Sequence, residues 1–356
     1  MCKENWVSKQ GRQNQKFLQE FENRLVPPQG IHDARKMVST PTVKTSRACP
    51  ISESREAFLV AEKDRHGAPL RNVMGKDSGL IFVDPVPFEN TEAFYKTEYR
   101  KSYKGVHRPK PKHIYRAGLV ALDRYERIKN FISKDGACLD AGSSSGEFVY
   151  LLKSRGHRAE GAEANEPYAE YSHSELGISV SILPFSKFKE EQQFDLITMF
   201  HVLEHLEHPI RDLTHLAKCL KPNGKLVIEV PNILYSDMAF SHKWHPGHLF
   251  SYTKNTLPLL MMKAGLETIS CSPIGDGGNL WGVFQKCGGQ PDTCSEPTDF
   301  DPSDDLRALR RGARSYYLNT RNYLKFIPKA LKQLREKAKS KSLSGIEILD
   351  KLYRND

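Results

Sequence analysis

The sequence lacks the features of a membrane-spanning or secreted protein. None of its apolar runs approaches the ~20 residues that a helix needs to cross a bilayer, and its first residues lack the apolar segment of a signal peptide. Its seven cysteines are scattered and none forms a C-x-x-C pair, so neither a zinc ribbon nor a disulfide framework is predicted. We therefore expect a cytoplasmic protein with reduced thiols.

The sequence also has little excess charge outside its C-terminal end. The net charge is +10 over 356 residues. From Ser303 to Asp356 there are 14 Lys and Arg against 6 Asp and Glu, so a surplus of eight positive charges lies in this tail. The rest of the chain is not notably basic, which disfavours a protein whose core grips nucleic acid.

One stretch predicts a strand, a tight turn and the start of a helix. An apolar run from Ala137 ends in Asp140, and a turn of small residues leads to an amphipathic run after Gly146. Gly142 and Gly146 have no Cβ, so a ligand can approach the main chain and the free N–H groups of the helix. A dinucleotide site would need glycines where Ser144 and Glu147 stand, and Asp140 would repel a diphosphate. The turn instead suits a ligand with cationic groups.

The pattern around this turn predicts a doubly wound α/β fold with a mostly parallel, seven-stranded, Rossmann-like sheet. A helix over 113–132 should cover the sheet, and a turn at 221–224 should precede the fifth strand. Strands are expected near 137–140, 158–163, 178–183, 194–199, 225–230, 266–271 and 281–287, and helices near 147–155, 166–176, 210–220 and 253–264.

A second group of residues provides candidate chemistry. Glu163 follows Asp140 by 23 positions and ends the second strand, where a carboxylate can accept both hydroxyls of a ribose. Seven of the 13 histidines lie between 201 and 248. An imidazole suits the removal of a proton at neutral pH, and the candidate bases are His245, His248 and then His201. The alternative is that these histidines only hold their loop through hydrogen bonds.

The same region permits a different enzyme. His201-Val-Leu-Glu204-His205 matches H-x-x-E-H, the signature of inverted zinc peptidases, in which two histidines on one helix face bind zinc. These residues directly follow a buried strand, however, and Pro209 shortens any helix. The zinc peptidase is therefore disfavoured.

Several motifs together resemble the class I S-adenosylmethionine (SAM) methyltransferases. The turn at 140–146 is similar to their motif D-x-G-x-G-x-G, with Ser144 at the middle glycine. Phe194-Asp195 with Leu203-Glu204-His205 is typical of the group that contains the ubiquinone-biosynthesis O-methyltransferases and many sugar and small-molecule relatives, and 221–226 resembles a turn of that group. The resemblance covers roughly residues 113–287.

The resemblance implies an enzyme that transfers a methyl group from SAM to a hydroxyl, amine or carbon of a small-molecule or sugar-containing acceptor and releases S-adenosylhomocysteine. In some relatives E-x-x-E-H binds a divalent cation, but His201 replaces the first acid here, and we expect no metal. The resemblance implies cofactor contacts from Asp140, Gly142, Ser143, Ser144, Gly146, Glu163, Pro184, Phe185 and His201.

The resemblance also suggests a division of the chain. Gly79 to Pro87 and the aromatic residues after Phe94 are similar to a small zinc-binding module, of whose cysteines only Cys49 remains. We expect a flexible arm (1–48), this degenerate module without metal (49–105), the methyltransferase core (106–287), an acidic Pro/Gly linker (288–305) and a basic amphipathic helical tail (306–356).

The role of the tail stays open at this stage. It can dock on the core, lie on an anionic membrane surface or contact an acidic partner. An RNA or protein acceptor guided by the tail, or a non-catalytic SAM-binding scaffold, are the alternative functions. The oligomeric state is open.

Overall fold

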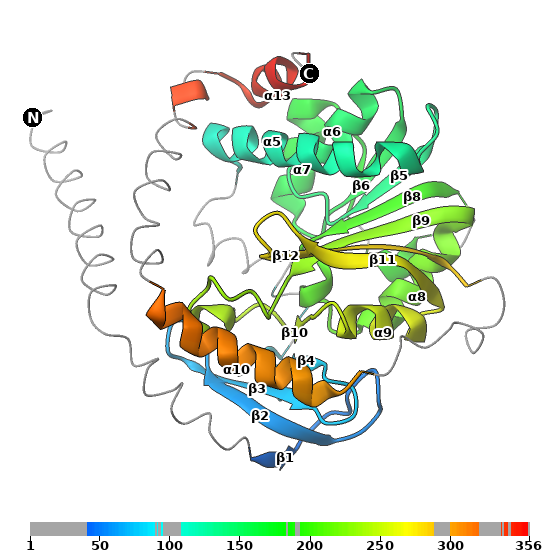
Figure 1. Ribbon diagram of the computed structural model, residues 1–356. Coiled ribbons are helices and arrows are strands. Elements are labelled where there is room, and N and C mark those ends of the chain that lie inside the picture. The colour runs from blue at the N-terminus through cyan, green and yellow to red at the C-terminus, as the bar shows by residue number, and fades with distance from the viewer. Residues whose placement is uncertain are drawn as a thin grey trace, which may run out of the picture.

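The computed structural model describes residues 41–89, 91, 94, 108–182, 184–188, 193–287, 300–319, 336, 338–340 and 343–354. These residues form two sheets with helices packed against both (Figure 1). Most of the arm expected at 1–48, the aromatic segment after Phe94 and most of the expected linker lie outside the described residues.

The larger sheet has seven strands in the order β11-β12-β9-β8-β5-β6-β7. Neighbouring strands from β9 to β7 are parallel, whereas β12 is antiparallel to both β9 and β11, so the predicted fold class is confirmed, including the antiparallel last strand. β5 is buried at every position because it lies mid-sheet with helices on both faces. The strands are β5 (Ala137–Ala141), β6 (Arg158–Ala162), β7 (Val180–Ser181), β8 (Phe194–Phe200), β9 (Leu220–Pro231), β11 (Leu266–Ile274) and β12 (Asn279–Lys286).

Helices cover both faces of this sheet. Three of them lie on one face: α5 (Pro111–Ile128), α6 (Glu147–Ser154) and α7 (Glu166–Leu176). The other face carries α8 (Pro209–Cys219) and α9 (Thr256–Lys263) (Figure 1). α5, α7 and α8 each have a proline in the first turn, where no backbone N–H is missed. None of the described helices has the length and apolar content that a membrane crossing requires.

The turn expected at 221–224 is part of β9 instead. Phe194 of β8 pairs with Leu220 and Leu196 pairs with Lys225, so the intervening residues of β9 bulge out of the ladder. A Cβ on Gly224 would lie 2.8 Å from the carbonyl oxygen of Phe194, and only glycine permits this close approach. The Pro-Asn-Gly signal therefore marks a bulge in a continuous strand.

The smaller sheet is antiparallel, with the order β1-β2-β3-β4-β10. One of its strands, β10, comes from the segment expected to be the methyltransferase core and pairs with β4 of the small N-terminal unit. β1 lies within the range expected to be a flexible arm, and its pairing with β2 orders it. The strands are β1 (Thr42–Lys44), β2 (Glu56–Lys63), β3 (Pro69–Gly75), β4 (Ile81–Val83) and β10 (Phe250–Ser251).

The cysteines differ in state. Cys49 is buried, and its Sγ lies 3.1 Å from Oγ of Ser78. Cys49, Cys138, Cys219 and Cys271 are free thiols. Cys287, after β12, is disulfide-bonded, so the expectation of reduced thiols is wrong at this position.

The described parts of the tail dock on the protein. α10 (Pro302–Leu318) buries Leu309 against the smaller sheet, and α13 (Gly345–Arg354) buries Leu349 against α5 and α6 (Figure 1). The end of the expected linker is also packed, because the buried Asp305 accepts hydrogen bonds from Thr253 Oγ1 (2.6 Å) and Asn255 Nδ2 (3.0 Å). The expected break at Pro328 lies outside the described residues.

Candidate active site

A single cavity of about 1550 Å³ lies at the carboxyl ends of the parallel strands and reaches β10 of the smaller sheet. This edge is where open α/β sheets bind ligands. Three further residues expected at the site, Asp140, Ser143 and Gly146, are not among the residues that line the cavity. The expected site residues that line it are Gly142, Ser144, Glu163, Pro184, Phe185, His201, His245 and His248.

The turn after β5 has an unusual backbone. Gly142 and Gly146 have φ angles of 85° and 83°, in the left-handed region that favours glycine. A Cβ on Gly142 would lie 2.1 Å from Cγ2 of Val202, so this position also has no room for a side chain. Ser144 has a φ of 53°, which explains why the related motif has glycine there.

Asp140 supports this turn from below. Its side chain is buried at the end of β5, where Oδ1 accepts a hydrogen bond of 2.7 Å from Thr198 Oγ1. Burial raises the pKa of Asp140 to about 6, although the hydrogen bond from Thr198 and the charge of Arg124 act in the opposite direction. At pH 7 most of the Asp140 carboxyl is therefore ionised, and it places a negative charge beneath the turn.

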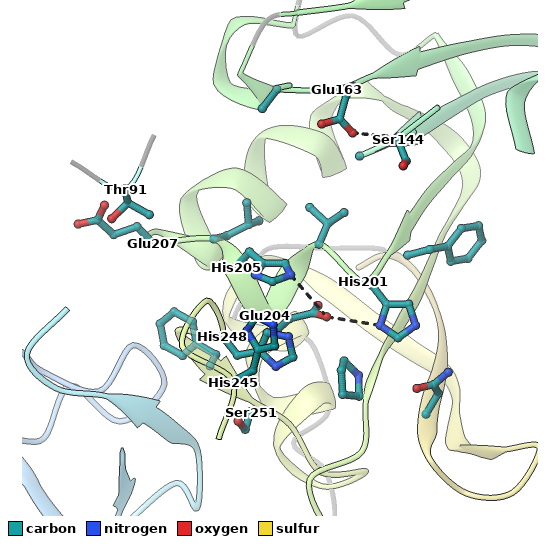
Figure 2. A pocket seen from close by; sticks show the side chains of 18 of the residues that line it. Thr91, Ser144, Glu163, His201, Glu204, His205, Glu207, His245, His248 and Ser251 are labelled. Carbon is teal, nitrogen blue, oxygen red and sulfur yellow. Dashed lines mark hydrogen bonds and ion pairs between the residues drawn. The ribbon is translucent and has the colours of Figure 1, made fainter. Parts of the chain in front are cut away.

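Glu163 presents its carboxylate to the cavity just after β6. Its Oε2 accepts a hydrogen bond of 2.8 Å from the backbone N–H of Ser144 (Figure 2), and its Oε1 accepts one of 2.9 Å from the backbone N–H of Asn165. These two bonds orient the carboxylate, which has about four acceptor positions, at the wall of the cavity. Pro184 and Phe185 add apolar wall to the cavity.

A buried glutamate stands among three histidines at the other end of the cavity. Glu204 belongs to a short helical turn, Leu203–His205, and is 1% exposed. Among the described residues, neither of its oxygens has a hydrogen-bond partner. Two histidine nitrogens lie near its Oε1, His201 Nδ1 at 3.5 Å and His205 Nε2 at 4.0 Å (Figure 2). His205 Nδ1 lies 2.7 Å from the carbonyl oxygen of Gly247 and therefore carries the proton, which leaves Nε2 as an acceptor.

His245 and His248 complete this histidine cluster. Their rings stack with centroids 4.4 Å apart, and His248 also meets His205 edge-on at 4.9 Å. Burial lowers the pKa of His245 to about 3 and that of His248 well below its ordinary value. Both rings are therefore neutral at pH 7, the form that can accept a proton.

His201 differs from the other two candidate bases. Its Nδ1 faces Glu204 and its Nε2 lies 3.4 Å from Oε1 of Glu229. Burial opposes a charge on His201, but the two carboxylates outweigh it and raise the pKa to about 9. An imidazole that is already protonated at pH 7 cannot take up a proton, which disfavours His201 as the base.

The zinc peptidase arrangement is not formed, because His201 turns toward Glu229 and Leu203–His205 is a short turn rather than an α-helix. Among the described residues, the ligand atoms that approach one another closely enough for a divalent ion belong to Glu204, His205 and His248, all within 4.8 Å. The same arrangement suits a carboxylate–histidine proton relay.

Two residues at the site were not expected from the sequence. Glu229 of β9 accepts hydrogen bonds from Arg124 Nε (2.7 Å) and Asn279 Nδ2 (2.6 Å). Burial would raise the pKa of Glu229, but His201 and Arg124 outweigh burial and lower this pKa to about 2. A lone acid in the apolar run 226–230 was the available signal. Nothing in the pattern of the helix at 113–132 distinguished Arg124.

The comparisons with known proteins agree with this arrangement. Residues 113–271 match the family described as a methyltransferase domain. The match identifies residues 113–271 as a methyltransferase domain, and their fold is the one expected of an enzyme whose cofactor is SAM. No curated protein matches the sequence.

Many solved methyltransferase structures are similar to this chain, and two of them illustrate the degree of similarity. One is 1,6-didemethyltoxoflavin-N1-methyltransferase from Burkholderia thailandensis, solved with 1,6-didemethyltoxoflavin and S-adenosylhomocysteine; it is 17% identical, with 58% of this chain and 95% of its own covered at a TM-score of 0.43. The other is the CcbJ methyltransferase from Streptomyces caelestis, 15% identical, with 55% and 99% covered at a TM-score of 0.42. Scores this low carry no information about the acceptor.

Proposed function

We propose that this enzyme transfers the methyl group of SAM to a hydroxyl, or to an amine or carbon, of a small-molecule or sugar-containing acceptor. The observation that carries the proposal is the single cavity that joins the turn after β5 to the histidine cluster. Pockets for one drug-sized ligand measure roughly 300–1,000 Å³, and the volume of about 1550 Å³ leaves room for the cofactor and an acceptor together.

The cofactor half of the cavity has a partner for each part of SAM. The backbone of Gly142 and Ser144 would contact the methionine part, supported from behind by Asp140, Ser143 and Gly146. The carboxylate of Glu163, an acceptor of hydrogen bonds that lines the cavity, suits the two ribose hydroxyls, and Pro184 with Phe185 suit the flat adenine. Bound SAM supplies a methyl group on a positively charged sulfur, which an acceptor atom attacks.

The acceptor half is supported by the histidine cluster. We assign the proton acceptor to His248, with His245 as the next candidate, because both rings are neutral and line the cavity. A proton gained by His248 would place an imidazolium near Glu204, whose buried carboxylate would stabilise it. For an amine or carbon acceptor, alignment with the methyl group would do most of the work.

The test is a screen of sugars and phenols in which formation of S-adenosylhomocysteine is measured. For a hydroxyl acceptor, His248→Gln should lower kcat by about 100- to 10,000-fold while the affinity for S-adenosylhomocysteine is unchanged. His173→Gln, on the exposed side of α7, is the matched control and should keep full activity. Full activity of His248→Gln would refute the assignment of the base, and turnover with RNA or protein alone would refute the acceptor class.

The docked tail does not favour a polymer acceptor. The apolar faces of α10 and α13, which include Leu309 and Leu349, are buried against the rest of the protein, so these faces need no external partner to explain them. Deletion of 303–356 would strip α10 and α13 from two hydrophobic clusters, and a loss of activity would then report unfolding. Charge substitutions on the tail, read against salt concentration, are the appropriate test of polymer binding.

A further inference from the structure

We propose that Arg124 of α5 binds the α-carboxylate of the methionine part of SAM. The inference rests on the proposed placement of SAM along the turn after β5. It extends the cofactor site to a residue before the family's glycine-rich motif. It also gives a role to a cation that the sequence pattern did not distinguish.

The guanidinium of Arg124 is held on two sides. Its Nε donates a hydrogen bond of 2.7 Å to Oε2 of Glu229, and its Cζ lies 4.2 Å from the ring centroid of Phe200, in cation–π contact. Glu229 is in turn bound by Asn279. These contacts fix the plane of the guanidinium before a ligand arrives, which reduces the entropy lost on binding.

The outer edge of Arg124 remains available to a ligand. A guanidinium has five N–H donors in a planar fork, and the structure gives only the Nε of Arg124 a hydrogen bond within the described part of the chain. The side chain is 17% exposed, and it lines the cavity together with Gly142 and Ser144. Nη1 and Nη2 can therefore meet a planar carboxylate, for which the fork is the best geometric match.

The position of Arg124 matches the methionine end of the cofactor. Phe200 and Glu229 come from the ends of β8 and β9, beside the turn after β5, and the charge of Arg124 reaches Asp140 at the base of that turn. Of the three other arginines of the cavity, Arg116 pairs with Glu336 and Arg211 with Asp212, and the charge of Arg65 acts at the histidine cluster. An anionic group lying on the turn therefore finds its cation in Arg124.

The experiment compares two ligands by calorimetry on the full chain: S-adenosylhomocysteine and its decarboxylated form, which keeps the adenosine and the ammonium. Arg124→Met should weaken binding of S-adenosylhomocysteine by about 10- to 100-fold, the effect of a lost charged hydrogen bond, and should change binding of the decarboxylated form by less than about threefold. Arg124→Lys, which keeps the charge without the fork, should fall between the wild type and Arg124→Met.

The matched control is Arg127→Met, one turn along α5. Arg127 pairs with Asp123 and does not line the cavity, so both affinities should stay at the wild-type values. The ratio of the two dissociation constants is insensitive to the fraction of folded protein, so it remains informative if Arg124→Met is less stable. If Arg124→Met leaves the ratio of the two dissociation constants unchanged, the proposal is overturned. That result is expected if Arg124 binds an acidic acceptor instead of the cofactor. Failure of the wild type to bind either ligand would overturn the placement of SAM itself.

Discussion

The substitution Asp140→Asn should make the protein more stable and its cofactor site weaker. Asp140 is buried, and its pKa rises from 3.8 to about 6 on folding. A carboxyl whose pKa is higher in the folded state binds more protons there, so stability falls as the pH rises from about 4 to about 6 and stays lower above that. At ~1.36 kcal/mol per pKa unit, the ionised carboxylate costs about 3 kcal/mol at pH 8, as an upper limit.

Asparagine removes this cost and keeps an Oδ1 that accepts the hydrogen bond from Thr198. Urea denaturation at pH 8 should therefore show a higher free energy of unfolding for Asp140→Asn, by up to about 3 kcal/mol, and the gain should shrink toward zero near pH 4. Calorimetry should show weaker binding of S-adenosylhomocysteine, because a negative charge is lost beneath the ammonium of its methionine part.

A control of opposite sign lies on the neighbouring strand. Asp195 accepts hydrogen bonds from Lys221 Nζ and the backbone N–H of Ala137, both at 2.7 Å, and these outweigh burial and lower its pKa. Asp195→Asn should therefore destabilise the protein at pH 8. If Asp140→Asn destabilises as well, or stabilises equally at pH 4 and pH 8, the reasoning from burial is refuted.

Two further substitutions test packing. Leu349→Ala in α13 should lower the free energy of unfolding by about 2–5 kcal/mol in urea denaturation, because the side chain is fully buried. The control Leu318→Ala should change this free energy little, because Leu318 is 83% exposed. Equal effects of the two substitutions would show that α13 does not dock. Gly142→Ala should weaken binding of S-adenosylhomocysteine and lower the melting temperature, because its Cβ would meet Val202. Gly156→Ala, at a similar φ with open space around it, should affect the melting temperature less and the binding not at all.

Much of the larger sheet could be predicted because its signals are local. The apolar run that ends at Asp140, the small residues after it and the amphipathic run after Gly146 each reflect only neighbouring residues, and they locate β5, its turn and α6. The position of Glu163 is also set over a short length of chain, because only one helix and one strand separate Glu163 from the turn. The lengths of the connections then allow few orders for the strands.

The failures of prediction occur where distant residues meet. Pro222-Asn223-Gly224 is an ordinary turn signal, but its pairing with β8 makes it a bulge. The acidic and proline-rich composition before Asp305 predicts a linker, and it gives no sign that Thr253 and Asn255 bind the carboxylate of Asp305 across about 50 positions. Composition does not contain these contacts, because they depend on which surfaces the folded core leaves for the chain to cover.

The sequence by itself determined the fold class and the methyltransferase motif, because hydrophobic period, glycine positions and strand-end acids act over a few residues. Only the tertiary structure separated the histidines, since the charge of His201 depends on Glu229 and the neutral state of His248 depends on burial. It likewise brought Arg124 to Glu229 across 105 positions. Charge states and ligand contacts follow from distances in space, and those distances exist only after the sheet has assembled.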